Sequence, residues 1–271
     1  MIRVGLVIVA IAVLAALFGP VLTPYDPSSQ ELARRLEGPS ASHLLGLDEL
    51  GRDILARLLA GTRISLLVGL AVVSVSSSVG MLLGSIAGYF GGRIDDLISR
   101  VIDVLMAFPG ILLAIALVAV LGPSLTNVVL ALSLIGWVGY ARLVRGQALR
   151  AREFDFVQAA RALGAGPGRI IIRHILPTAM PAVVVQATLG MAGTIIAEAA
   201  LSFLGLGVQP PTPSWGTMLD AGRSHLFDAP HLTIFPGLAI ALLVLGLNFL
   251  GDGLRDRVDP KLAGSSVGRN P

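Results

Sequence analysis

The chain has 271 residues, of which 54% are hydrophobic and only 14% are charged, and its mean hydropathy is +0.82. Soluble domains carry about a quarter charged residues, so this composition excludes a water-soluble globular protein and predicts an all-α membrane protein. The absence of cysteine excludes disulfides and thiolate metal sites. A net charge of +3 on so apolar a chain indicates membrane orientation signals rather than a nucleic-acid partner.

Six apolar stretches are predicted to cross the membrane as helices, because a spanning helix needs about 20 apolar residues and satisfies its backbone hydrogen bonds internally. They are residues 4–22, 64–90, 104–121, 125–141, 179–201 and 232–250. A signal peptide is the alternative for the first stretch. The apolar run is longer than a usual signal core, however, and no small-residue cleavage site follows it, so a span is favoured.

The distribution of cations predicts that both termini are cytoplasmic. If each stretch crosses once from an inside N-terminus, fourteen of the twenty Lys and Arg residues fall in inside segments. Seven of these are arginines between residues 142 and 174, a segment with a net charge of +5. Cytoplasmic loops carry the excess of Lys and Arg in membrane proteins, which fixes the predicted orientation.

Two outside segments and one glycine pattern carry further predictions. The apolar residues of segment 44–59 fall at helical spacing, which predicts a short amphipathic helix on the outer surface. Segment 203–230 is dense in Gly and Pro and is predicted to form turns without a regular element. Gly80, Gly84 and Gly88 recur every four residues, which favours close packing of a neighbouring helix over a pore-lining role.

The residues indicate no enzyme chemistry. A nucleotide-binding loop needs Gly-Lys-Ser/Thr, whereas the only lysine, Lys261, stands between Pro260 and Leu262. The four histidines lie in loops or at the ends of stretches, so an intramembrane hydrolase lacks its nucleophile and base, and no metal-ligand cluster is visible. We therefore expect that this chain has no catalytic residue and binds no cofactor or metal.

Glu198 is the one ionisable group that lies deeper in a predicted span. Charges inside membranes tend to mark pathways or partners. Glu198 follows Thr194 by one helical turn and precedes Ser202 by another, near the outer end of the fifth stretch. We expect it to reach the outer interface or to hydrogen-bond a loop, and a part in an outer gate is the alternative.

The arginine-rich segment 142–174 is predicted to form a helix, a turn and a second helix. Residues 155–163 are compatible with a helix, and Gly164 is placed to end it. A second helix is predicted to start at Arg169 and to stop at Pro177, because proline cannot continue the backbone hydrogen bonds. Such a helix would protrude into the cytoplasm and offer a surface to another protein.

The spacing of this segment resembles the EAA loop of permease subunits in bacterial ATP-binding cassette (ABC) importers. The resemblance consists of two alanines, a glycine after three further residues, and Leu-Pro after eleven more. The residues that carry it are Ala159, Ala160, Gly164, Leu176 and Pro177. The chain departs from the motif at Gln158, where the family usually has an acid, and at His174, where it usually has isoleucine.

Further motifs resemble the second permease subunit of the peptide and nickel branch of that family. They lie at residues 43–53, 107–109, 197–205 and 251–256, in the expected order, and cover essentially the whole chain. The resemblance implies six transmembrane helices in the type I ABC importer (MetI-like) fold. It also implies an N-terminal helix with an extracytoplasmic segment at 1–61, a permease domain at 62–251 and a cytoplasmic tail at 252–271.

The resemblance implies a bacterial or archaeal cytoplasmic-membrane protein that imports di- or oligopeptides, with nickel, glutathione or another small solute as alternatives. Its partners would be a second permease, two ABC ATPases that use the ATP, and an extracytoplasmic solute-binding protein. The implied ATPase-coupling residues are Gln158, Ala159, Ala160, Leu163, Gly164, Leu176 and Pro177. A secondary transporter is the alternative from another class, but it would need coupling-ion carboxylates near the bilayer midplane.

Overall fold

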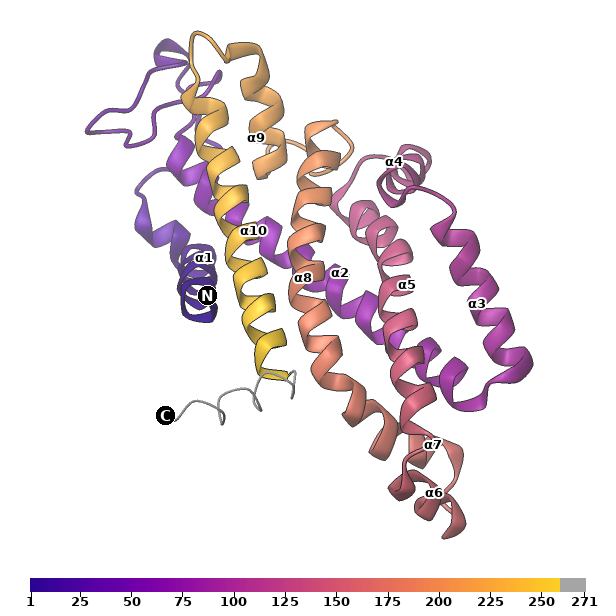
Figure 1. Ribbon diagram of the computed structural model, residues 1–271. Helices are drawn as coiled ribbons and strands as arrows, with labels where there is room; N and C mark the ends of the chain where they lie inside the picture. The colour runs from indigo at the N-terminus through magenta and orange to yellow at the C-terminus, as the bar shows by residue number, and fades with distance from the viewer. Residues whose placement is uncertain (259–271) are drawn as a thin grey trace, which may run out of the picture.

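The computed structural model describes residues 1–258 and is almost entirely helical (Figure 1). Residues 259–271, which hold Lys261 and most of the predicted tail, lie outside the described residues. The long helices are α1 (Ile2–Leu22), α2 (Ile54–Phe90), α3 (Gly92–Met106), α4 (Gly110–Leu121), α5 (Leu125–Ala151), α8 (Leu176–Phe203) and α10 (His231–Val258). The short elements are η1 (Leu32–Arg34), α6 (Asp155–Ala162), α7 (Pro167–Ile170), the π-helical turn η2 (Ile171–Ile175), α9 (Trp215–Gly222) and η3 (Arg223–His225).

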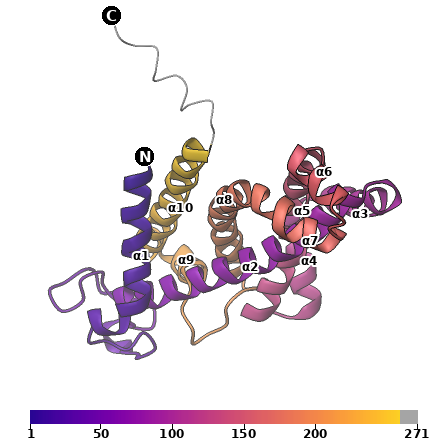
Figure 2. The ribbon, with the colours of Figure 1, turned by 90° about the horizontal axis from the view of Figure 1, so that it is seen from below.

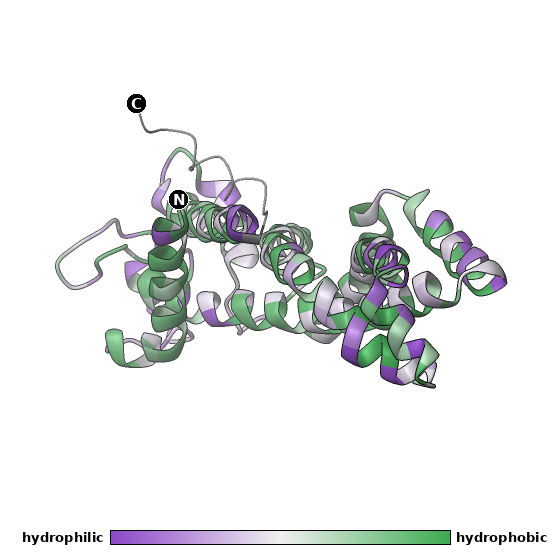
Figure 3. Cartoon of the chain, turned by 60° about the horizontal axis from the view of Figure 1, so that its bottom comes forward, coloured by the Kyte–Doolittle hydropathy of each residue, from purple (hydrophilic) through white to green (hydrophobic). Residues whose placement is uncertain are grey.

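The predicted all-α membrane fold is confirmed. Five helical segments are long and apolar enough to span a bilayer, and a sixth span is formed if α3 and α4 count as one bent pair. Apolar residues predominate on most of the long helices, whereas α3 carries charged residues along its length (Figure 3). The stretch 104–121 is not the one continuous helix that is predicted, because the chain bends by 84° between α3 and α4. Pro109 precedes α4 and disfavours helical backbone at Phe108, which explains the break.

Helix α2 holds the bundle together. It runs diagonally across one face of the row formed by α10, α8 and α5 (Figures 1 and 2), and its contact with α5 is the most extensive between any two helices of the described chain. Gly80, Gly84 and Gly88 lie against the backbone or Cβ atoms of residues 137–149 on α5. The glycine pattern is therefore a helix-packing surface, as predicted.

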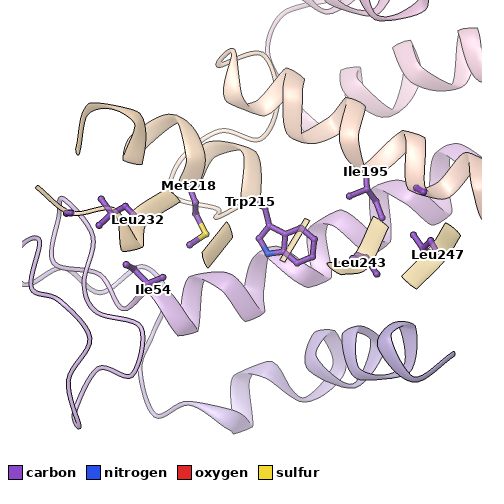
Figure 4. Packing of buried hydrophobic residues seen from close by; sticks show 9 residues of the cluster. Ile54, Ile195, Trp215, Met218, Leu232, Leu243 and Leu247 are labelled. Carbon is purple, nitrogen blue, oxygen red and sulfur yellow. The ribbon is translucent and has the colours of Figure 1, made fainter. Parts of the chain in front are cut away.

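The end of the bundle that carries α9 has its own apolar core (Figure 4). Trp215 of α9 is buried among side chains of α2, α8 and α10, and its Nε1 donates a hydrogen bond to the carbonyl oxygen of Leu58 at 3.0 Å. The prediction that segment 203–230 has no regular element is wrong. Ser214 and Thr217 form a reciprocal capping box that starts α9, a signal that the Gly and Pro density obscured.

The predicted amphipathic helix at 44–59 is also wrong. The chain turns through Gly46 and Gly51, both at positive φ, and α2 starts only at Ile54, where the Asp53 carboxylate accepts a hydrogen bond from the amide of Ala56. A compact group of buried charged and hydrogen-bonded pairs fills the turns. The pairs are His43–Asp53 at 2.8 Å, Asp48–Arg52 at 2.7 Å and Asp48–Arg57 at 3.3 Å.

Substituting Gly84 tests the packing of α2 on α5. A Cβ at Gly84 would collide with the carbonyl group of Ala141, which is backbone and cannot rotate away. Gly84→Ala is expected to destabilise the detergent-purified protein by about 1–3 kcal/mol, measured as a lower thermal midpoint. Gly146→Ala on α5 is the control, because its Cβ would meet nothing within 4 Å. An unchanged midpoint for Gly84→Ala would contradict the packing.

Candidate functional site

Helix α6 forms the tip of the bundle at the end opposite α9 (Figure 1). As predicted, it starts at Asp155, whose charge suits a helix N-terminus, and its last turn is closed around Gly164. The amide of Gly164 donates to the carbonyl oxygen of Arg161, and the amide of Ala165 donates to that of Ala160, both at 3.0 Å. This is a Schellman cap, which needs the left-handed backbone that Gly164 adopts at φ +81°.

The inner face of α6 is anchored to the long helices. Val157 is fully buried in a cluster that contains residues of α5, α7 and η2. The side-chain amide of Gln158 donates to the carbonyl oxygen of Arg152 at 2.8 Å, and the Arg152 guanidinium donates to the carbonyl oxygen of Gly88 on α2 at 3.3 Å. The guanidinium of Arg161 lies 5.5 Å from the ring centre of Tyr89. A force on α6 therefore reaches both α5 and α2.

The outer face of the same segment exposes apolar side chains. Leu163 is 89% exposed, and Phe154, Phe156 and Ile172 are also exposed. Gln158, Ala159 and Gly164 are exposed as well, and Ala160 is half-buried. Large apolar groups gathered in a segment that is otherwise rich in arginine are typical of a protein-interaction surface.

The second helix of the segment does not stop at Pro177, which corrects the prediction. Helices α7, η2 and α8 follow one another without interruption, and Pro177 lies in the first turn of α8. The wider π-helical turn that precedes it relieves the clash between a proline ring and the carbonyl four residues earlier. Leu176 is half-buried and Pro177 is exposed, so both lie where α8 leaves the α6 hairpin.

Glu198 does not snorkel, because it is fully buried in α8. Its Oε1 accepts a hydrogen bond from Ser202 at 2.7 Å, and the Ser202 hydroxyl accepts one from the amide of Val208 in the following loop at 3.3 Å. Ser65 of α2 and Ser214, which caps α9, are its other polar neighbours. The carboxyl group thus stands where α2, α8 and α9 meet, and its link to the loop runs through Ser202.

Variants of Glu198 test whether this carboxyl group holds the junction together. Glu198→Gln keeps an acceptor for Ser202 and is expected to retain most of the stability. Glu198→Leu leaves the buried Ser202 hydroxyl without its acceptor and is expected to cost about 1–3 kcal/mol. Thermal midpoints of the purified protein measure both, with Thr188→Val, an exposed hydroxyl on the same helix, as the control. Equal midpoints for Glu198→Leu and Thr188→Val would contradict a structural role for the carboxyl group.

Comparisons with known proteins agree with this architecture. Residues 80–264 match the family described as binding-protein-dependent transport system inner membrane component, and residues 1–39 match the N-terminal TM domain of oligopeptide transport permease C. The methionine ABC transporter MetNI in inward-facing conformations has the same fold, with a TM-score of 0.60 and 20% identity over 74% of this chain and 96% of that one. The predicted MetI-like fold is thereby confirmed.

Two relatives are similar over nearly the whole chain. The dipeptide transport system permease protein DppC of Alkalihalophilus pseudofirmus is 49% identical over 259 residues, which cover 96% of this chain and 85% of that protein. The glutathione transport system permease protein GsiD of Pectobacterium atrosepticum is 49% identical over 255 residues, which cover 94% and 85%. The chain belongs to the family of binding-protein-dependent transport permeases, the inner-membrane components of these transport systems.

Proposed function

We propose that this chain forms half of the translocation pathway of an ATP-driven importer of di- or oligopeptides. A second, homologous permease forms the other half, two ABC ATPases bind on the cytoplasmic side, and a solute-binding protein delivers the peptide from outside. The relatives named for dipeptide transport support the substrate class. This chain binds no cofactor in this scheme, and its partners use the ATP.

The single observation that carries the proposal is the construction of α6. It is short, capped at Gly164, anchored through Val157 and exposed at Leu163. A rigid helix of this kind can enter a groove of an ATPase and move with it. Closure of the nucleotide sites would then displace α5, α8 and α2 together and switch the bundle between inward-open and outward-open states.

The arrangement of the ends supports cytoplasmic placement of α6. Ile2 lies against Gly253, so the N-terminus and the end of α10 lie at the same end of the bundle. Helix α8 starts at that end and runs opposite to α10 (Figure 1). In this orientation the seven arginines of segment 142–174 face the cytoplasm, as cations near membrane spans usually do. The α9 end then faces outward, where the binding protein would dock and the outer gate would lie.

Glutathione is a second candidate substrate, because a relative that is also 49% identical to this chain is named for glutathione transport. Glutathione is itself a peptide, so the two candidates require similar recognition of amide groups. A competition assay with the matching binding protein distinguishes them.

Reconstitution tests the function directly. The complete complex in proteoliposomes, with ATP enclosed and the binding protein outside, is expected to accumulate labelled dialanine only when ATP is hydrolysed. Labelled glutathione and nickel serve as comparison substrates. Accumulation driven by an ion gradient without ATP would instead support a secondary transporter and would refute the proposal.

A charge placed on α6 tests the docking surface. Leu163→Asp removes no contact inside the chain, since the side chain is 89% exposed, but it would place a charge in a desolvated interface. We expect ATPase recovered with the affinity-purified permease to fall at least about tenfold, since an unpaired buried charge costs several kcal/mol. Phe227→Asp is the matched control, because Phe227 is fully exposed near α9. Equal ATPase recovery for the two variants would rule out docking at Leu163.

A further inference from the structure

A cavity of about 250 Å³ lies among α2, α4, α5 and α8, apart from both the α6 surface and Glu198. Its walls are mostly apolar, with glycines on α4, α5 and α8, and its polar side chains are Ser76, Tyr140, Gln186 and Thr194. Within residues 1–258, no charged side chain lines it. A cavity of this kind, with a few polar groups on an apolar wall, is typical of a small-molecule site.

Two of the four polar side chains already direct their hydrogen atoms to the protein. The hydroxyl of Thr194 donates to the carbonyl oxygen of Gly190 at 2.9 Å, and that of Ser76 donates to the carbonyl oxygen of Ser133 at 3.5 Å. The first bond lies within α8 and the second joins α2 to α5, and both restrict these groups. They contribute to the shape of the cavity more than to the recognition of a ligand.

The hydroxyl of Tyr140 differs from those of Ser76 and Thr194, which donate hydrogen bonds to the protein. The Tyr140 side chain is only 4% exposed, and its hydroxyl has no hydrogen-bond partner in the described part of the chain. A buried hydroxyl without a partner costs roughly 1–3 kcal/mol, so its retention at a cavity wall calls for an explanation. The hydroxyl lies beside Gly190, where a Cβ would come within 2.7 Å of it, so the glycine leaves room for the oxygen at the edge of the cavity.

Gln186 stands one helical turn before Gly190, on the same wall. Its Nε2 lies 3.8 Å from the position that a Cβ of Gly139 would occupy, so the amide reaches α5 next to Tyr140. A hydroxyl and a carboxamide together offer donors and acceptors but no charge. They match an uncharged amide group, whereas a charged terminus would pay the cost of desolvation without a counter-charge.

We propose that Tyr140 and Gln186 form a hydrogen-bonding site for a main-chain amide of the peptide during its transport. The inference rests on the peptide import proposed above and identifies residues that would contact the substrate. Every peptide has this amide, whatever its side chains. Such a site would therefore bind many different peptides, and the binding protein would determine which peptides are imported.

The test uses the complete complex in proteoliposomes and measures labelled dialanine imported per ATP hydrolysed at saturating binding protein. Tyr140→Phe keeps the ring packed against Val144, Ala179 and Val183 and removes one oxygen. Tyr140→Phe and Gln186→Leu are each expected to lower the import-to-ATP ratio about two- to tenfold. This fold-change corresponds to the free energy of one hydrogen bond between uncharged groups. The ATPase rate is expected to stay unchanged. The thermal midpoint is expected not to fall, and for Tyr140→Phe to rise, because the variant removes a buried hydroxyl without a partner in the described part of the chain.

Ser133→Ala is the matched control, because Ser133 on α5 also carries a buried hydroxyl without a partner among residues 1–258 but does not line the cavity. An unchanged ratio for both test variants, or an equal fall for Ser133→Ala, would overturn the inference. A wild-type complex that hydrolyses ATP but imports no peptide would refute peptide import itself. The wild-type complex therefore tests peptide import, and the variants test the site at Tyr140 and Gln186.

Discussion

The close contact between α2 and α5 is the constraint on which the rest of the bundle depends. In a bilayer, apolar side chains gain little by leaving lipid for protein, so helices associate through tight packing of small residues. Gly80, Gly84 and Gly88 let α5 approach α2 at backbone distance. With this pair fixed, α4 packs on α5, and α8 packs on both α2 and α5. The cavity around Tyr140 lies among these helices.

Different interactions stabilise the two ends of the bundle. At the α6 end, a helix cap and a small apolar cluster hold a short helix whose other face is left exposed. At the α9 end, the buried Asp48–Arg52 ion pair, the His43–Asp53 hydrogen bond and the carboxyl group of Glu198 hold irregular backbone in place. Buried charges that lose a partner are costly, so the α9 end is specified by exact pairing, whereas the α6 end is specified by its cap and its shape.

Much of this could be predicted from the sequence, and the failures have physical causes. Hydropathy located the long spans because the bilayer requires long apolar helices, and Gly164 marked the end of α6 because only glycine readily adopts its backbone. The predicted helix at 44–59 ignored the cap at Asp53, and the predicted turns at 203–230 overlooked the capping box at Ser214. Ser202 lies one turn from Glu198 on the same helix, so its spacing could be read from the sequence. Ser65 and Ser214 near Glu198, and Gly190 near Tyr140, come from elements distant in sequence, so no local pattern could identify them.

The length of α2 has a mechanical consequence. Its 37 residues make a rod of about 55 Å. Near one end Gly61 packs against Trp215, and near the other the carbonyl oxygen of Gly88 accepts a hydrogen bond from Arg152. A rod of that length turned by about 5° around its midpoint moves its two ends by about 2 Å in opposite directions. A lever of this kind opens one side of a passage as it closes the other, with no relay of side chains between them.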